Sequence, residues 1–274
     1  METSWMVSSN IEKVAEALIS TPQKVKISQY LLTFMVMVYL ITQPFPDISY
    51  LYLAIFVYFI QGCMGVTALY HRSLSHKSWI PCKPLEYFSA IAASIGGTSS
   101  PINWVTTHIA HHKYADTKLD PHSVKYGGYG VLFSNYNLTK VARPPVALLR
   151  NKFYMFLYEY YYGIIFSWAA VLYLIDPLFF WWAWAIPVVL QIWASTLNNW
   201  TTHNKWGYTR YKTSDDSKNI WWFPFSWGEA WHNNHHAEPW TYSFSRKWYE
   251  IDMTGMYIWL MIKLGLATKG QKWS

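Results

Sequence analysis

Two long stretches of the chain contain no lysine or arginine, and they constrain its fold more than any other feature. They run over residues 27–71 and 153–204, and all 22 basic residues lie outside them. Each stretch can hold two membrane helices of about 20 residues with a tight turn between them. Buried helices of a water-soluble domain are the alternative, but a domain of this size has little room for two such stretches. The pattern therefore predicts membrane helices.

Proline and aspartate divide each stretch in two, at Pro44-Phe45-Pro46-Asp47 and at Asp176-Pro177. We therefore expect one domain, residues 1–274, with four transmembrane helices at about 27–43, 49–70, 158–175 and 178–199. Because basic residues favour the cytoplasmic side, the positive-inside rule predicts that both termini are cytoplasmic. The cytosolic segments would then be 1–26, 71–157 and 200–274.

The net charge of +7 suits an anionic lipid surface better than nucleic acid, because apolar spans separate the basic residues. Two further segments are expected to lie in the membrane interface. Residues 11–19 repeat apolar side chains at helical spacing, which is typical of an amphipathic helix. Residues 253–262 are apolar but too short to span. The partners expected are membrane lipid and no nucleic acid.

All ten histidines lie at or beyond the predicted cytoplasmic ends of the spans. Neutral imidazole binds Zn, Cu, Fe and Ni, and nine imidazoles are too many for one tetrahedral zinc. They fit two metals with four or five ligands each. The tenth, His122, lacks ligand spacing, and we expect it to form hydrogen bonds instead. The nine candidate ligands are His71, His76, His108, His111, His112, His203, His232, His235 and His236.

The spacing of these histidines predicts how they meet. Residues at i, i+3 and i+4 share one face of a helix, so the triples at 108–112 and 232–236 should each converge and could serve two adjacent metals. His71 and His76 lie about 140° apart on an α-helix. We therefore expect either unwinding at 72–75 or one ligand for each metal. The nearby carboxylates are interpreted either as acceptors that orient ligand rings or as surface acids; they are Asp116, Asp120 and Glu229.

The combination of motifs resembles the membrane fatty acid desaturases of the Δ9 type, which act on stearoyl-CoA or acyl lipids, in their bacterial form. The resemblance covers about residues 50–266 and is far more specific than any one motif. The matching residues are Tyr70-His71-Arg72 with His76, Trp104 with His108-xx-His111-His112, Asp120-Pro121-His122-Ser123, Asn199-xxx-His203-xx-Trp206-Gly207-Tyr208, Gly228-Glu229-xx-His232-Asn233-Asn234-His235-His236 and Lys247-Trp248-Tyr249-Glu250-Ile251-Asp252.

This resemblance implies an all-α integral membrane protein whose four transmembrane helices are capped by a cytosolic helical layer with a histidine-rich dimetal site. It implies two Fe²⁺ ions held by the nine histidines, with O₂ as oxidant. Asn199 matches a position that reaches one metal through water, or is a buried polar contact. Trp104 matches a wall position of the acyl tunnel, or is an ordinary core aromatic residue.

The implied reaction is the introduction of a cis double bond, at Δ9, into a saturated acyl chain. Thr106 and Thr107 stand where animal acyl-CoA desaturases have an Arg-Asp pair that contacts the CoA head. Because that pair is missing here, an acyl chain linked to a glycerolipid or to a carrier protein is open as the substrate beside an acyl-CoA. No fused cytochrome b5 is expected, so electrons would come from separate ferredoxin or cytochrome b5 with an NAD(P)H-dependent reductase. The expected location is the bacterial inner membrane, with a cytoplasmic active site.

Two other functions are open. A hydroxylase or ketolase uses the same histidine motifs, and a small shift of the substrate could favour oxygen insertion over loss of a second hydrogen. A metal transporter would use histidine sites too, but transport needs ionisable groups along the membrane path. The predicted spans hold Glu159 and Asp176 near their ends and little else of this kind.

Overall fold

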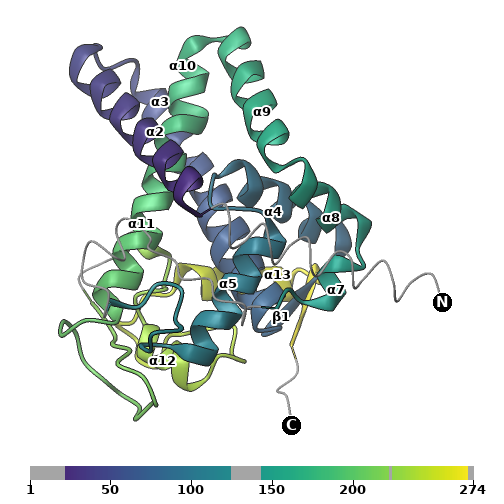
Figure 1. The fold of residues 1–274 in the computed structure, drawn as a ribbon, viewed down its shortest axis with the longest axis vertical. Helices are drawn as coiled ribbons and strands as arrows, with labels where there is room; N and C mark the ends of the chain where they lie inside the picture. Colours follow the sequence, from purple (N-terminus) through teal and green to yellow (C-terminus); the bar gives the residue numbers. More distant parts are fainter. Residues whose placement is uncertain (1–21, 125–142, 222–223, 271–274) are drawn as a thin grey trace.

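The computed structural model describes residues 22–124, 143–221 and 224–270, and regular structure within these ranges is almost entirely helical (Figure 1). The predicted interfacial helix at 11–19 lies outside the described residues. The helices of the first half are α2 (Pro22–Thr42), α3 (Ile48–Tyr58), η1 (Phe59–Ser75), α4 (Lys83–Ile95) and α5 (Pro101–Tyr114). Those of the second half are α7 (Val146–Leu149), α8 (Lys152–Glu159), α9 (Tyr161–Ile175), α10 (Pro177–Phe180), η3 (Trp181–Ala185), α11 (Ile186–Thr202), η4 (Pro224–Ser226), α12 (His232–Ala237) and α13 (Met253–Lys263).

Two helical hairpins form one end of the molecule, α2 with α3 and α9 with α10 (Figure 1). An aspartate caps the second helix of each hairpin. Asp47 accepts a hydrogen bond from the Ser49 N–H at 2.9 Å, and Asp176 accepts one from the Leu178 N–H at 2.8 Å. Since a capping side chain satisfies one of the free N–H groups of the first turn, both helices can start directly after the turn. The Tyr50 hydroxyl donates to Asp176 at 3.1 Å and joins the two turns.

Within the described ranges, two continuous helices are long and apolar enough to cross a membrane, Ile48–Ser75 and Pro177–Thr202. The other two predicted spans coincide with shorter apolar helices, Ile27–Thr42 and Tyr161–Ile175. The last of these starts later than expected because Tyr160 has a non-helical backbone that separates α8 from α9. The described residues therefore contain four apolar helices at the predicted places, two of them of full membrane-crossing length.

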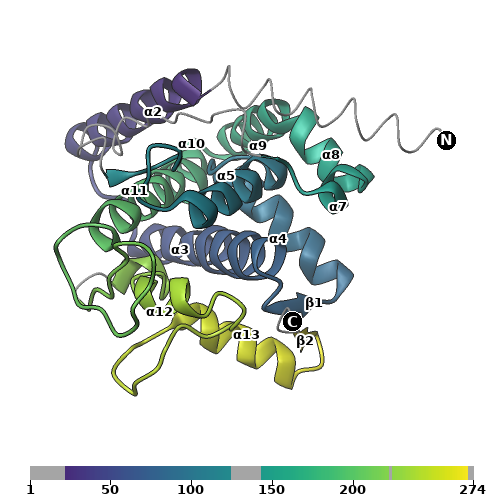
Figure 2. The same ribbon diagram turned by 60° about the horizontal axis from the view of Figure 1, so that its bottom comes forward.

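The helix η1 continues α3 without interruption but is wound as a π-helix over 17 residues. In this geometry each N–H bonds to the carbonyl five residues earlier, and such turns are frequent at functional sites. Figure 2 shows α3 and η1 running through the middle of the molecule, with α5 on one side and α12 and α13 on the other. The end of η1 therefore lies beside both segments that carry a histidine triple.

Close packing of η1 against α4 depends on Gly65. A Cβ atom at this position would lie 2.8 Å from the Ala93 Cβ and 2.9 Å from the Ala93 backbone nitrogen. Real Cβ contacts are almost never this short, and a backbone atom cannot move aside cheaply.

Replacing Gly65 with alanine should therefore lower the free energy of unfolding by about 1–3 kcal/mol, the usual cost of overpacking a core. Thermal unfolding in detergent measures this. Gly163→Ala is the matched control, because Gly163 lies in α9 with nothing within 4 Å of an added Cβ. There alanine should stabilise the helix by about 1 kcal/mol. Equal melting temperatures for Gly65→Ala and wild type would contradict the close approach.

Two short strands follow the helices η1 and α13 and pair with each other. β1 (Trp79–Pro81) pairs antiparallel with β2 (Ala267–Lys269), with Ile80 opposite Thr268. The Trp79 indole is 1% exposed and donates to the Ala68 carbonyl of η1 at 2.8 Å. The pairing holds the segment after α13 against the end of η1, close to the histidines.

Candidate metal centre

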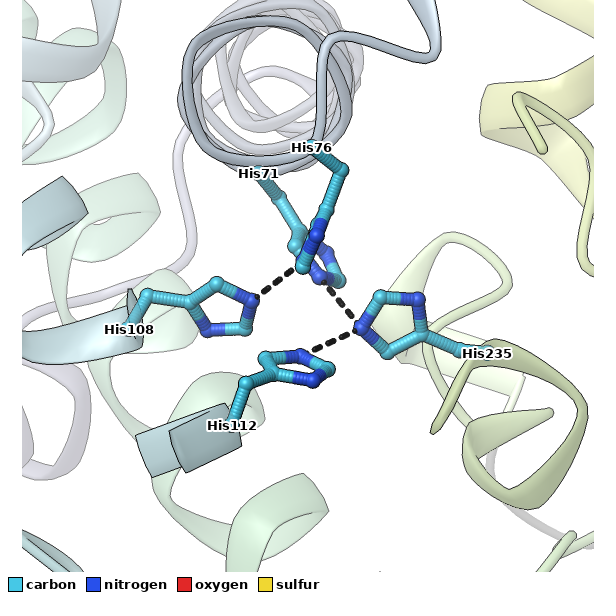
Figure 3. A group of neighbouring side chains, drawn as sticks. All are labelled: His71, His76, His108, His112 and His235. Carbon is cyan, nitrogen blue, oxygen red and sulfur yellow. Dashed lines mark hydrogen bonds between the residues drawn. The ribbon is translucent and has the colours of Figure 1, made fainter. Parts of the chain in front are cut away.

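The nine predicted ligands come together in two adjacent groups at the end of the molecule opposite the hairpins. Within each group the potential ligand atoms lie within 4.8 Å of one another. The five-histidine site consists of His71, His76, His108, His112 and His235 (Figure 3). The four-histidine site consists of His111, His203, His232 and His236.

Each histidine triple contributes to both sites, so the predicted convergence is confirmed. On α5, His108 and His112 face the five-histidine site, while His111 faces the other. On α12 the division is reversed, with His235 in the five-histidine site and the remaining two in the four-histidine site. The rings of His112 and His236 stack at a centroid distance of 4.4 Å. The two sites are therefore direct neighbours.

His71 and His76 both belong to the five-histidine site, at a ring centroid distance of 5.1 Å. The alternative of one ligand for each metal is therefore wrong, while the expected unwinding takes the form of a π-helix that continues to Ser75. On an α-helix, residues five apart would diverge. The π-helix brings positions i and i+5 close to one face, and the His76 N–H bonds to the His71 carbonyl at 3.2 Å.

The spacing of the imidazole nitrogens fits metal ligands. The Nε2 atom of His235 lies 2.9 Å from that of His71 and 2.8 Å from that of His112, and the His76–His108 pair is 2.8 Å apart. In the other site, His232 Nε2 lies 3.0 Å from the Nε2 atoms of His203 and His236. Two nitrogens bound at right angles to one metal, with bonds of about 2.1 Å, would be separated by about 3.0 Å.

Carboxylates bind the outer nitrogens of four rings. The Nδ1–oxygen distances are 2.5 Å for His71–Glu229, 2.9 Å for His111–Asp120, 3.0 Å for His203–Asp116 and 2.8 Å for His236–Asp215. A carboxylate at Nδ1 holds the proton there, so that the Nε2 lone pair points into the site. The Nε2 atom of His111 is buried without a hydrogen-bond partner. Several Nε2 lone pairs thus face one another. A bound cation would stabilise this arrangement.

Three of these carboxylates were predicted as ring acceptors, and the alternative of surface acids is wrong because all three are buried. The fourth carboxylate, Asp215, was not predicted from the sequence. It lies 21 residues from His236 in a polar loop, and no helical spacing relates the two. Its only sequence signal is a pair of acidic residues, Asp215-Asp216, between two histidine motifs.

Burial keeps most imidazoles of the two sites neutral. It is the largest cause that lowers the pKa of His76, His108, His112, His232 and His235 far below the usual value, and neighbouring imidazoles add to it. Burial would also raise the pKa of Asp120 and Asp215, but hydrogen bonds and charge attraction from His111 and His236 outweigh it and bring both pKa values below the usual range. Neutral imidazoles with ionised carboxylates are the state that binds metals.

The lowered pKa of His236 makes the stability of the metal-free protein depend on pH. Burial lowers its pKa from 6.5 to about 4, although Asp215 opposes the shift. Between pH 6.5 and pH 4 the unfolded chain binds a proton at His236 that the folded chain does not. The contribution of this ring to the free energy of unfolding is therefore fully present above pH 6.5 and decreases as the pH falls. At pH 5 the loss from this ring should be about 2 kcal/mol.

Protonation of His236 alone should therefore lower the melting temperature of metal-free protein by several degrees from pH 7.5 to pH 5, at about 2–4 °C for each kcal/mol. His236→Gln should remove this share of the pH dependence, because glutamine does not titrate, while the other rings with lowered pKa values still contribute theirs. Equal melting temperatures for the unsubstituted protein at both pH values would contradict it.

The remaining predicted residues lie around the two sites. Trp104 is half-buried, and its ring stacks on His108 at 4.9 Å. The ring of His122 lies 4.7 Å from His111, and its backbone N–H donates to Asp120. Asn199 is half-buried on α11, one helical turn before His203. The tunnel role of Trp104 and the water-mediated role of Asn199 stay predictions.

The helices and the histidine clusters together define a class of protein. Apolar helices of membrane-crossing length end at a layer where buried imidazoles form two adjacent sites that could hold metals. Over its described residues this is a mostly helical protein with two helices long and apolar enough to cross a membrane and two adjacent histidine clusters that could each hold a metal ion.

Comparison with known proteins gives the family. The model of the family "Fatty acid desaturase" matches residues 48–257. Among curated proteins, "Delta-9 acyl-lipid desaturase 2" of Arabidopsis thaliana is 35% identical over 78% of this chain and 72% of its own length. "sn-1 stearoyl-lipid 9-desaturase" of Anabaena variabilis is 34% identical over 78% and 81%. "Acyl-CoA C20 Delta5-desaturase" of Anemone leveillei is 37% identical over 77% and 70%.

The chain therefore belongs to the fatty acid desaturase family, and it is an oxidoreductase of the desaturase class. The resemblance to Δ9 desaturases inferred from the motifs is confirmed. The matched region contains every histidine of the two sites.

Proposed function

We propose that this chain is an O₂-dependent di-iron desaturase that introduces a cis double bond at Δ9 of a saturated acyl chain. The observation that carries the proposal is the gathering of nine imidazoles into a five-histidine and a four-histidine site that share α5 and α12. In this proposal the nine histidines are iron ligands, and Asn199 adds a water-mediated contact. Two bound iron ions would supply the reduction of O₂ and the removal of two hydrogen atoms from the substrate.

The protein's own part is orientation and exclusion of water. Carboxylates fix the Nδ1 protons of His71, His111, His203 and His236 and thereby aim the Nε2 atoms inward. The indole of Trp104 covers His108 and lies 5.9 Å from the ring of His71. We assign Trp104 to the wall of the acyl slot, where it would hold a methylene pair beside the site. Correct placement of reacting groups is worth several kcal/mol of the barrier.

The overall reaction balances with an external reductant. One CH₂–CH₂ unit, one O₂, two electrons and two protons give one cis CH=CH unit and two waters. The electrons would come from a separate carrier, ferredoxin or cytochrome b5, that is reduced by an NAD(P)H-dependent reductase.

For the substrate we propose an acyl chain esterified to a membrane lipid rather than to CoA. Two of the relatives described above are named acyl-lipid or stearoyl-lipid desaturases. Thr106 and Thr107 also argue against a CoA head at the place where other relatives carry charge. Both hydroxyls donate to carbonyls of their own helix, at 2.6 Å and 2.9 Å, and neither side chain is charged.

The topology proposed has four spans, with both termini and the histidine sites in the cytoplasm. The distribution of the 22 basic residues supports it. So do the apolar side chains that the hairpin helices turn outward, among them Ile41 and Leu174, which are 79% and 82% exposed. Large exposed apolar surfaces mark contact with a membrane or a partner.

Expression in a desaturase-deficient bacterial host, followed by fatty acid profiling, tests the function. The proposal expects monounsaturated chains that are two mass units lighter than the saturated substrate, with the double bond at Δ9, first in the glycerolipid pool. A gain of one oxygen would instead indicate the hydroxylase or ketolase. First appearance of the product as acyl-CoA would contradict the lipid-linked substrate.

A further inference from the structure

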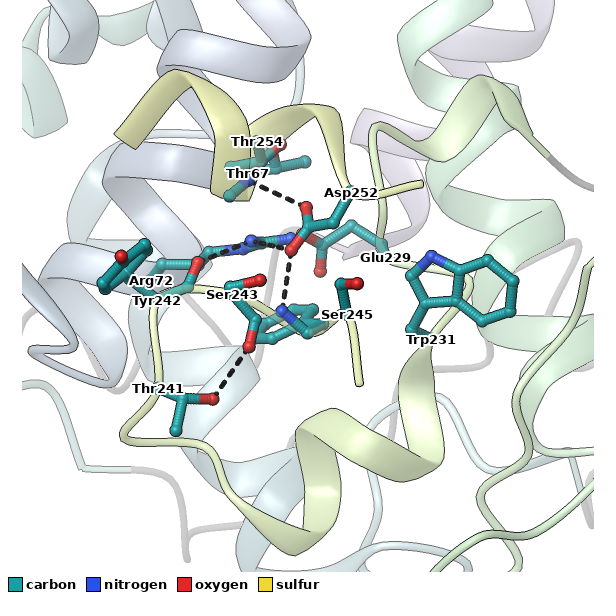
Figure 4. A network of polar contacts seen from close by, with 12 residues as sticks. Thr67, Arg72, Glu229, Trp231, Thr241, Tyr242, Ser243, Ser245, Asp252 and Thr254 are labelled. Atoms are coloured by element: carbon teal, nitrogen blue, oxygen red, sulfur yellow. Dashed lines mark hydrogen bonds and ion pairs between the residues drawn. The ribbon is translucent and has the colours of Figure 1, made fainter. Parts of the chain in front are cut away.

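A fully buried arginine lies next to His71 on η1 but belongs to neither histidine site. Arg72 is 0% exposed, and its guanidinium donates to Glu229 Oε1 at 2.9 Å, to Asp252 Oδ2 at 2.8 Å and to the Tyr242 carbonyl at 2.8 Å (Figure 4). The other oxygen of Glu229 accepts from His71 Nδ1. A continuous polar chain therefore runs from Asp252 through Arg72 and Glu229 to the five-histidine site.

The four histidine-binding carboxylates differ in what else holds them. Asp116 accepts from the Asp216 N–H at 2.8 Å, Asp120 from the Asp116 N–H at 2.9 Å, and Asp215 from the Ser217 N–H at 3.0 Å. Backbone donors thus fix all three carboxylates of the four-histidine site. In the described part of the chain, arginine binds Glu229 alone among the four.

Phe244 connects the same arginine to the site by packing. The Arg72 guanidinium lies 3.7 Å from the centroid of the Phe244 ring, which is 0% exposed. The ring also lies 4.4 Å from the ring of His235 and 5.6 Å from that of His71. A cation over an aromatic face is attractive, especially where water is excluded. Arg72 therefore fixes both a hydrogen-bond partner of His71 and the surface on which His235 rests.

We propose that Arg72 is a positioning residue that acts through Glu229 on the five-histidine site and leaves the four-histidine site unaffected. The inference rests on the proposed dimetal function. The planar guanidinium holds two carboxylates at fixed angles, which the single ammonium group of lysine cannot reproduce. Without it, Glu229 would lose a charged donor that fixes its rotamer, and the tautomer and direction of His71 would no longer be set.

Titration of metal-free protein in detergent with Co²⁺ tests this without any turnover, because the visible absorption of Co²⁺ reports its ligands. Wild-type protein should bind two ions. Arg72→Gln should retain one ion at wild-type affinity and bind the other about 10- to 100-fold more weakly, as typically follows loss of a residue that orients a ligand. Asp120→Asn, which acts on His111, should weaken the other ion, so that the two variants lose different absorption bands.

A matched control and a coupling test separate positioning from folding. Arg246 forms an ion pair with Glu238 away from the ligand carboxylates, so Arg246→Gln should bind two ions normally. If Arg72 acts mainly through Glu229, the double variant Arg72→Gln/Glu229→Gln should lose much less affinity than the sum of the two single losses, and the small remainder would report the contact through Phe244. Additive losses, or wild-type affinities in folded Arg72→Gln, would overturn the inference.

Arg72→Lys covers the case in which Arg72→Gln does not fold. It keeps the charge, so it should fold and show an intermediate loss at the five-histidine site. Wild-type binding by Arg72→Lys, or unfolding of every Arg72 variant, would leave Arg72 a folding role alone and overturn the inference. Wild-type protein that bound fewer than two ions would instead contradict the dimetal centre of the proposed function, whatever Arg72 does.

Discussion

Replacing His235 with alanine should abolish desaturation and reduce the iron content of the purified protein. His235 is the central member of the five-histidine site, because its Nε2 atom lies within 3 Å of the Nε2 atoms of both His71 and His112. Its removal takes away a nitrogen that two neighbouring ligands depend on for their arrangement. The loss of turnover should exceed the 10- to 100-fold that typically follows removal of a residue that only orients a ligand.

Fatty acid profiles of cells that express the variant, together with iron analysis of the purified protein, measure this. His122→Ala is the control, since His122 groups with His111 and Asp120 at the edge of the four-histidine site but is not among its four imidazoles. It should retain measurable desaturation. Full activity of His235→Ala would mean that the imidazoles gathered in Figure 3 do not hold the metal. His111→Ala applies the same test to the four-histidine site and should also be inactive.

Removal of the metal with a chelator should abolish desaturation, and Fe²⁺ should restore it while Zn²⁺ should not. Both ions suit imidazole ligands, but zinc has no redox chemistry and cannot take part in the reduction of O₂. Product formation by chelated and reconstituted protein, with O₂ and a reductant present, measures the effect. Restoration by zinc to the same level as by iron would exclude an oxidative reaction.

Metal binding should also stabilise the fold, which gives a readout independent of activity. An ion that binds the folded chain alone adds about 2.7 kcal/mol of stability at 100 times its dissociation constant. The reason lies in the sites themselves, where buried imidazole nitrogens approach one another to 2.8–3.0 Å. Zinc should therefore raise the melting temperature even though it does not restore activity. This separates the loss of a redox metal from the loss of folded protein.

The spacing of the histidines made much of the site predictable. Residues at i, i+3 and i+4 on one helix must share a face, so the triples on α5 and α12 could be expected to converge from local geometry alone. The same rule failed for His71 and His76. It applies to an α-helix, and nothing local to residues 71–76 announces that η1 is wound with i→i+5 bonds.

The hydrogen-bond partners of the site were only partly predictable. Asp116 and Asp120 follow the first triple closely, and Glu229 precedes the second, so proximity along the chain suggested them. Asp215 and Phe244 have no such relation to the rings that they contact. Asp252 lies 180 residues from Arg72, and only the packing of α13 against η1 brings them together.

By itself the sequence determined the apolar helices, the turns that interrupt them and the identity of the imidazoles, because these depend on composition and on spacing within one helix. The tertiary structure decided which imidazole lies in which site, which carboxylate holds which ring, and which of these carboxylates a buried arginine binds. Those choices are made by side chains that approach from separate segments. Their distances depend on how helices pack, and no periodicity along the chain encodes that packing.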